Sequence, residues 1–151
     1  MPFPTTNTRR TLASALDRAQ AQAGSLKAIA ANNRIAMAAG PVTSGRLLSL
    51  LDNLVGAKTV LSEAAALPGI AAYAEDQLGD ATDDIGAEFT AMMDAIDDAG
   101  GWIITNFPKD GSGYLLAETL TAQGAHVERT FTSAQTAALR TLLTALEATI
   151  D

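Results

Sequence analysis

The chain of 151 residues contains no cysteine and a single histidine, and aromatic residues make up only 5% of it. Without cysteine there is no disulfide framework, thiolate metal site or cysteine nucleophile, and one histidine cannot form a multi-histidine metal site. No run of about 18 or more apolar residues occurs, so we expect no membrane-spanning helix. Residues 1–10 are polar where a signal peptide would be apolar. These absences predict a protein that is not an enzyme, needs no cofactor or metal and does not enter a membrane.

Hydrophobic residues make up 48% of the chain, charged residues 18%, and the formal net charge is -7. This length suits one domain of about 100 to 200 residues. Alanine supplies much of the apolar share, and because it is the best helix former and buries little area, the composition favours closely packed helices. We expect a mainly α fold, a bundle of long amphipathic helices with a β-hairpin inserted before the C-terminal helix. An extended N-terminal arm (1–7) would precede a single helical domain (8–151), with the hairpin at about 113–131.

The first long helix is predicted over residues 8–39, where apolar or small residues recur at alternating spacings of four and three. Leu16 and Leu26 lie on this heptad seam and are interface candidates, because the seam could face another subunit. The alternative is that the seam lies inside the monomer. Asn33 also falls on the seam, where it would either fix register and oligomeric state as a buried residue or mark fraying near the helix end. The seam consists of Leu12, Leu16, Ala19, Ala23, Leu26, Ala30, Asn33 and Met37.

Glycine and proline mark the later boundaries. Gly40 and Pro41 end the first helix, and Thr43 or Ser44 can cap a second helix that runs to about Leu67. Pro68 suits the first turn of a third helix. A capping box at residues 132–135, of the form S/T-x-x-E/Q, predicts the start of the C-terminal helix. The second helix carries a wide apolar stripe of Leu47, Leu48, Leu51, Leu54, Val55 and Leu61.

Two interpretations compete for residues 102–107. Gly100 and Gly101 followed by Trp-Ile-Ile-Thr look like the start of a strand. Ile96, Ile103 and Phe107 nevertheless keep helical phase across the glycine pair, which favours a weakened or kinked helix. Trp102 is then a core or interface anchor.

The hairpin is predicted from two alternating segments, 114–120 and 125–131, that flank a glycine-containing connection. We expect Val127 and Phe131 to lie against the bundle. Since an open strand edge offers unpaired backbone groups to a partner, Tyr114, Glu118 and Glu128 are interface candidates.

Charge is unevenly distributed along the chain. Residues 1–58 contain seven basic and two acidic residues, residues 59–108 contain ten acidic and no basic ones, and the remainder has a net charge of -2. Antiparallel helices could neutralise these halves within one subunit. Alternatively, the basic N-terminal segment, including Arg9 and Arg10, could bind the acidic face of a neighbouring subunit. Direct binding of nucleic acid is disfavoured, because a chain of net charge -7 repels phosphates and no aromatic residues are interleaved with its arginines.

Three stretches of the second half carry a resemblance: 68–74 (PGIAAYA), 106–111 (NFPKDG) and 129–140 (RTFTSAQTAALR). Here the chain resembles small uncharacterised proteins encoded among the structural genes of tailed bacteriophages and prophages. The resemblance brings no catalytic residues. It implies a virion structural subunit of the neck, tail, baseplate or capsid surface, made in the bacterial cytoplasm. The heptad helices, the polar N-terminal arm and the opposite charge of the two halves favour a homo-oligomer whose partners are other copies of itself and other virion proteins. The alternatives are a monomeric helical adaptor or regulatory protein that binds one partner, and an acidic DNA-mimic inhibitor.

Overall fold

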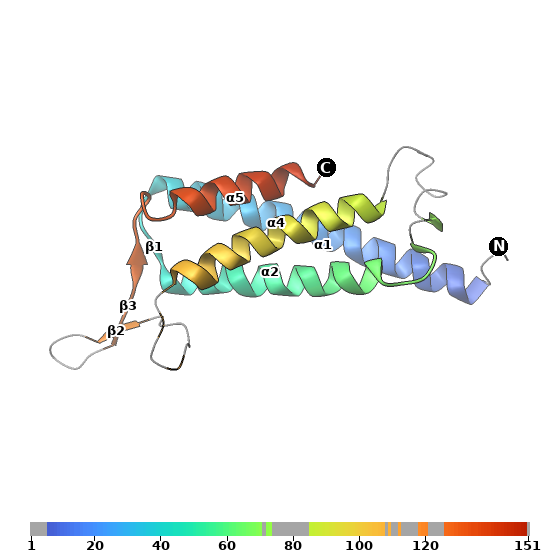
Figure 1. The fold of residues 1–151 in the computed structure, drawn as a ribbon, viewed down its shortest axis with the longest axis horizontal. Coiled ribbons are helices and arrows are strands. Elements are labelled where there is room, and N and C mark those ends of the chain that lie inside the picture. Colours follow the sequence, from blue (N-terminus) through green and yellow to red (C-terminus); the bar gives the residue numbers. More distant parts are fainter. Residues whose placement is uncertain are drawn as a thin grey trace.

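Four packed helices account for most of the residues that the structure describes. The structure is a computed structural model, and it describes residues 6–70, 72–73, 85–107, 109, 112, 118–120 and 126–150. The mainly α prediction is confirmed. The helices are α1 (Thr6–Ala39), α2 (Ser44–Ala65), α4 (Ile85–Asn106) and α5 (Ala137–Ala148) (Figure 1).

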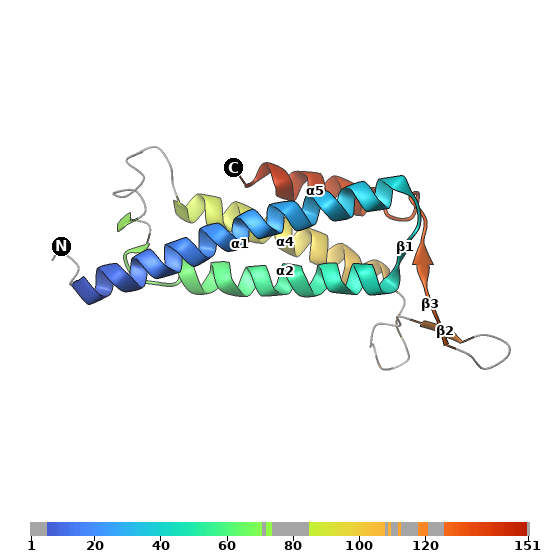
Figure 2. The ribbon, with the colours of Figure 1, turned by 180° about the vertical axis from the view of Figure 1, so that it is seen from behind.

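The helices form a bundle in which each one packs against two others. Helix α1 contacts α2 and α5, and α4 contacts the same two helices. Neighbours run in opposite directions, so the chain goes up and down the bundle (Figures 1 and 2). Helix α1 is the longest, and its N-terminal end extends past α5 (Figure 2). The connection between α1 and α2 (residues 40–43) is short, which favours their antiparallel arrangement.

The heptad seam of α1 lies inside the monomer. Leu26 has no exposed surface and Leu16 is also buried, with α2 and α5 packed against α1. These two leucines are therefore core residues of a single chain and not surface that a second subunit could contact. The heptad spacing predicted the buried face but could not tell whether the covering helices belong to the same chain.

Helix α1 begins at Thr6, slightly before the expected start at residue 8. The expected extended arm is therefore wrong for Thr6 and Asn7, and residues 1–5 lie outside the described residues. Threonine and asparagine both favour helix N-termini, so the helix can begin soon after Pro4.

Thr43 caps the N-terminus of α2, as the sequence predicted, and a residue of β3 (His126–Glu128) provides a second cap. The Thr43 hydroxyl accepts a hydrogen bond from the Arg46 backbone N–H (3.2 Å). In addition, a carboxylate oxygen of Glu128 accepts from the backbone N–H of Gly45 (2.6 Å). Glu128 thus supports a helix of its own chain, and its role as an interface residue stays a prediction.

Helix α4 continues through Gly100 and Gly101 to Asn106. Residues 102–106 are helical, as favoured, and the backbone N–H of Phe107 still bonds to the carbonyl of Ile103 (2.8 Å). Neither glycine has a positive φ. Contacts with α2 and α5 hold the helix across a pair of residues with poor helix propensity.

The predicted hairpin is present, with β2 (Glu118–Leu120) antiparallel to β3 (His126–Glu128). The sequence did not predict a second pair, in which β4 (Thr130–Phe131) runs antiparallel to β1 (Val42–Thr43). Phe131 packs against the core beside Phe107, with ring centroids 5.5 Å apart. Val127 is 50% exposed because β3 projects beyond the end of the bundle, so its expected burial is wrong (Figure 1).

The capping box before α5 is formed in both directions. The Gln135 side chain accepts from the Thr132 backbone N–H (2.8 Å), and the Thr132 hydroxyl accepts from the Gln135 backbone N–H (3.2 Å). Residues 133–136 form a turn, and α5 proper begins at Ala137. The box therefore predicted the position at which the chain turns into the helix.

Candidate functional site

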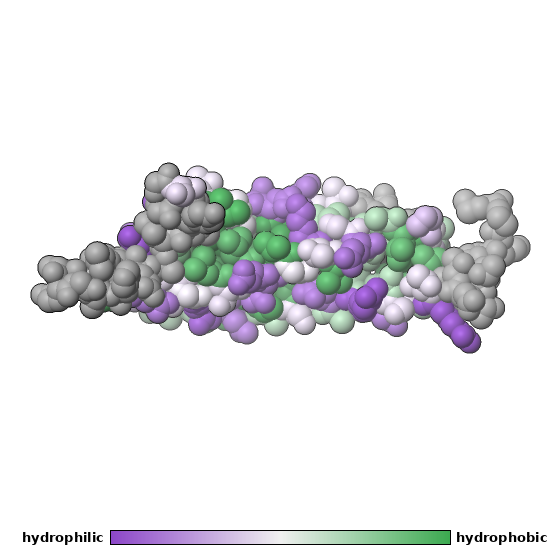
Figure 3. All heavy atoms as spheres, turned by 90° about the horizontal axis from the view of Figure 1, so that it is seen from below, coloured by the Kyte–Doolittle hydropathy of each residue, from purple (hydrophilic) through white to green (hydrophobic). Residues whose placement is uncertain are grey.

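A groove between α2 and α4 is the candidate functional site. It has a volume of about 540 Å³, and Leu51, Val55 and Ile104 lie along it. Val55 and Ile104 are 57% and 48% exposed, one on each helix. Apolar side chains gather on this side of the bundle, toward the hairpin (Figure 3). An apolar groove between two helices is a place where another molecule can bury side chains.

Two glycines form part of the groove. A Cβ atom on Gly101 would meet no heavy atom within 4 Å, and one on Gly100 would lie 3.6 Å from Leu51 Cδ1, an ordinary contact. Packing within the chain therefore does not require glycine at either position. Each glycine inside a helix costs about 1 kcal/mol relative to alanine. Gly100 is buried and Gly101 is partly exposed, so Gly101 alone leaves helix backbone open in the groove.

An ion pair crosses the groove. Lys58 Nζ of α2 lies 2.6 Å from Asp97 Oδ1 of α4, and the two side chains are 43% and 52% exposed. Because α2 and α4 are antiparallel, Leu51 and Val55 lie with Gly100, Gly101 and Ile104 on the hairpin side of this pair. The Ser62 hydroxyl donates to the Met93 sulfur (3.2 Å) on its other side. The apolar half of the groove thus ends at the Lys58–Asp97 pair.

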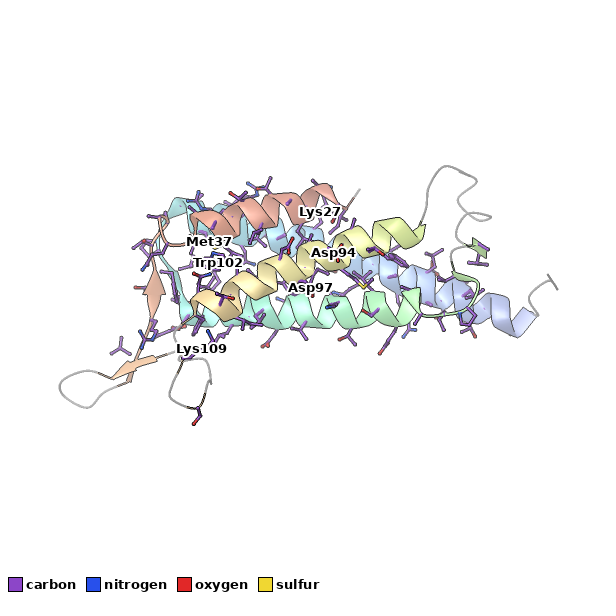
Figure 4. The ribbon with its side chains drawn as sticks, in the orientation of Figure 1. Lys27, Met37, Asp94, Asp97, Trp102 and Lys109 are labelled. Carbon is purple, nitrogen blue, oxygen red and sulfur yellow. The ribbon has the colours of Figure 1, made fainter. Side chains whose placement is uncertain are left out.

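Of the two helices that border the groove, α4 is acidic, whereas α2 carries two acidic and two basic residues. Figure 4 shows Asp94 and Asp97 on the middle part of α4, with Trp102 further along the same helix toward the strands. Helix α4 contains no lysine or arginine. Lys58 already pairs with Asp97, and Glu63 and Asp94 lie beyond this pair, whereas Lys109 donates to the carbonyl of Thr105, next to Ile104 in the chain. The exposed carboxylates are Asp52, Glu63, Asp94, Asp97 and Asp98.

A separate polar network surrounds Asn33 and links three helices. Arg46 Nε of α2 donates to Asn33 Oδ1 (3.0 Å), and Asn33 Nδ2 donates to the Ile29 carbonyl (2.8 Å). Next to it, Arg34 donates to both carboxylate oxygens of Glu147 on α5 (2.6 and 3.1 Å). Hydrogen bonding to Glu147, followed by its charge, raises the pKa of Arg34. Asn33 is therefore a buried residue that joins helices of one chain, rather than a frayed end.

The remaining interface candidates are scattered. Arg10 is exposed on α1, and Arg9 belongs to α1 with a side chain outside the described set. Trp102 is half-buried and packs against the core. Glu118 lies in β2, but its side chain is not among those described, and Tyr114 lies outside the described residues.

None of the candidates chosen from the sequence lines the α2–α4 groove. Val55 was part of the apolar stripe of α2, and Ile104 followed the glycine pair. The signal that could have identified them is the width of that stripe, which one neighbouring helix cannot cover completely.

No protein-family model, curated protein or solved structure matches the chain. Among the described residues, no helix is both long and apolar enough to cross a membrane. Within that same part of the chain, histidine and acidic side chains form no group of three or more that could hold a metal ion.

Proposed function

We propose that the chain is a non-enzymatic structural or assembly subunit of a tailed-phage particle that acts through protein–protein contacts. The observation that carries this proposal is the α2–α4 groove, where Val55 and Ile104 are exposed beside the glycine pair. Burial of apolar surface contributes about 25 cal/mol per Å², so covering these side chains with a partner is favourable. The groove thus supports a contact function, and the resemblance of residues 68–140 supports the virion as its setting.

Under this proposal, the partners are other copies of the chain and other virion proteins. The position would be the neck, tail, baseplate or capsid surface, after synthesis in the bacterial cytoplasm. Binding of the basic N-terminal segment, with Arg9 and Arg10, to a neighbouring acidic face also remains a prediction. The exposed carboxylates on α2 and α4 are compatible with such a contact.

The proposal is tested first by mass spectrometry of purified particles from the source of the chain. We expect the wild-type chain in them at a fixed ratio to other virion proteins. A double variant, Val55→Gln with Ile104→Gln, should fold normally and be lost from the particles. Ile35→Gln is the matched control, because Ile35 is equally exposed but lies on α1, outside the groove.

Two results would count against the proposal. Absence of the wild-type chain from particles at every stage of assembly would contradict a structural or assembly role. Normal incorporation of the Val55→Gln/Ile104→Gln variant would instead show that the groove is not the contact surface.

A monomeric helical adaptor that binds one partner is the second candidate. It is favoured by the burial of Leu16 and Leu26 within a single chain, which leaves the bundle core complete without a second copy. Sedimentation equilibrium distinguishes the two candidates. A monomer at all concentrations, together with absence from particles, would favour the adaptor.

A further inference from the structure

We infer that the occupant of the α2–α4 groove is an amphipathic helix of a different protein, with lysine or arginine residues on both sides of its apolar stripe. This inference rests on the proposed protein–protein function and adds the chemistry of the partner. Two independent features of the groove carry it, namely its shape and its charge.

The shape of the groove suits a helix. Two antiparallel helices, α2 and α4, form its sides, and a third helix can place its side chains between theirs. Val55 and Ile104 are available for apolar contact. Gly101 is partly exposed and carries no side chain that would hold a partner away, so a helix can approach the α4 backbone there.

The charge of the groove selects a basic partner. Glu63 and Asp97 line the groove itself, and the exposed sides of α2 and α4 carry three further carboxylates, Asp52, Asp94 and Asp98. Lys58 is the single basic residue that lines the groove, and it is paired with Asp97. A second copy that placed the same groove face against this one would be repelled, because both faces carry these carboxylates. A helix with flanking lysines or arginines would be attracted instead.

Lys58 acts in this arrangement as an internal competitor. Its ammonium group forms an ion pair with the Asp97 carboxylate at the end of the apolar half of the groove. Exposed ion pairs are weak, so a cationic side chain of the partner can replace Lys58 on Asp97. Removal of Lys58 should therefore strengthen binding of a basic helix, which a purely apolar docking site would not explain.

The test uses the full chain and two synthetic helical peptides with the same leucine stripe, at positions i, i+3, i+4 and i+7. Lysines flank the stripe in one peptide and glutamates flank it in the other. Titration calorimetry should show binding of the lysine peptide, with an affinity at least about tenfold higher than that of the glutamate peptide. Affinity for the lysine peptide should fall as salt rises, because exposed charges are screened.

Variants of the chain then test whether the lysine peptide binds in the groove. Val55→Gln with Ile104→Gln should weaken binding of the lysine peptide about tenfold, whereas the control Ile35→Gln should leave it unchanged. Asp97→Asn should weaken binding and Lys58→Met should strengthen it, each by about threefold. Circular dichroism of every variant verifies that the bundle remains folded.

Several outcomes would overturn the inference. Failure of the lysine peptide to bind, equal affinity for both peptides, or equal affinity of the groove variant and wild type would each do so. Self-association of the wild type that the groove variant abolishes would assign the groove to a second copy. In any of these cases, detection of the chain in particles would still support the assembly function separately.

Discussion

The seam of α1 and the groove between α2 and α4 are both apolar, yet only the seam is covered by its own chain. Leu16 and Leu26 are buried on the side of α1 that faces the core of the bundle. Val55 and Ile104 remain about half exposed where α2 meets α4. An apolar helical stripe thus has a structural role when two neighbours cover it, and is available to a partner when one side of it remains open.

The difference between the two regions has a local physical cause. In the seam, small residues such as Ala19 and Ala30 are fully buried, which is consistent with close packing against the neighbouring helices. In the groove, Gly101 leaves space above the α4 backbone, whereas Gly100 is buried beside Leu51. Small residues therefore allow close helix packing in the α1 seam, whereas in the α2–α4 groove a small residue leaves an opening.

The largest expected effect is at the seam. Leu26→Ala should lower the free energy of unfolding by about 2–5 kcal/mol, because it leaves a cavity in the core. Leu16→Asp with Leu26→Asp should abolish the folded state, since unpaired charges would be buried. Urea denaturation followed by circular dichroism measures both. A folded species of smaller size in sedimentation would instead place the seam between subunits.

A smaller change in the free energy of unfolding is expected at Asn33, the polar residue of the seam. Asn33→Ala should lower the free energy of unfolding by about 1–2 kcal/mol, because Arg46 Nε loses its acceptor. A double-mutant cycle with Arg46→Ala should give a coupling free energy of at least about 0.5 kcal/mol. Additive effects of the two changes would show that the hydrogen bond does not join α1 to α2.

In the groove, a substitution should stabilise the fold. Gly101→Ala should raise the free energy of unfolding by up to about 1 kcal/mol, because alanine is the better helix former and its Cβ meets no neighbouring atom. Thermal denaturation of this variant beside wild type is sufficient. A loss of stability would mean that Gly101 is needed by the fold, and the opening would then be a structural feature.

The smallest effect is expected at the ion pair of the groove. Lys58→Met should change the free energy of unfolding by less than about 1 kcal/mol, because the pair is exposed and screened by water and salt. Urea denaturation at low and high salt should give similar differences from wild type. A much larger loss would indicate that the Lys58–Asp97 pair holds α2 against α4 and is part of the fold.

Local signals predicted much of the fold. Gly40, Pro41 and Thr43 correctly separated α1 from α2, and the reciprocal bonds of Thr132 and Gln135 preceded α5 as expected. Helical phase through the glycine pair correctly favoured a continuous α4. These features depend on a few neighbouring residues, so the sequence is sufficient to predict them.

Contacts between distant segments were not predictable in the same way. The β1–β4 pair joins segments that are far apart in the sequence and too short to show a period. The bond from the Gly45 N–H to Glu128 links residues 83 positions apart. The exposure of Val55 and Ile104 depends on how closely two helices pack, and neither position differs in type from the buried residues of the same stripe.

The most direct test of the contrast between seam and groove is the free energy of unfolding of the Val55→Gln/Ile104→Gln double variant, measured in urea. We expect a value within about 0.5 kcal/mol of wild type, because both side chains already face water. A loss of more than about 2 kcal/mol would contradict it, because these residues would then stabilise the fold as the core leucines do.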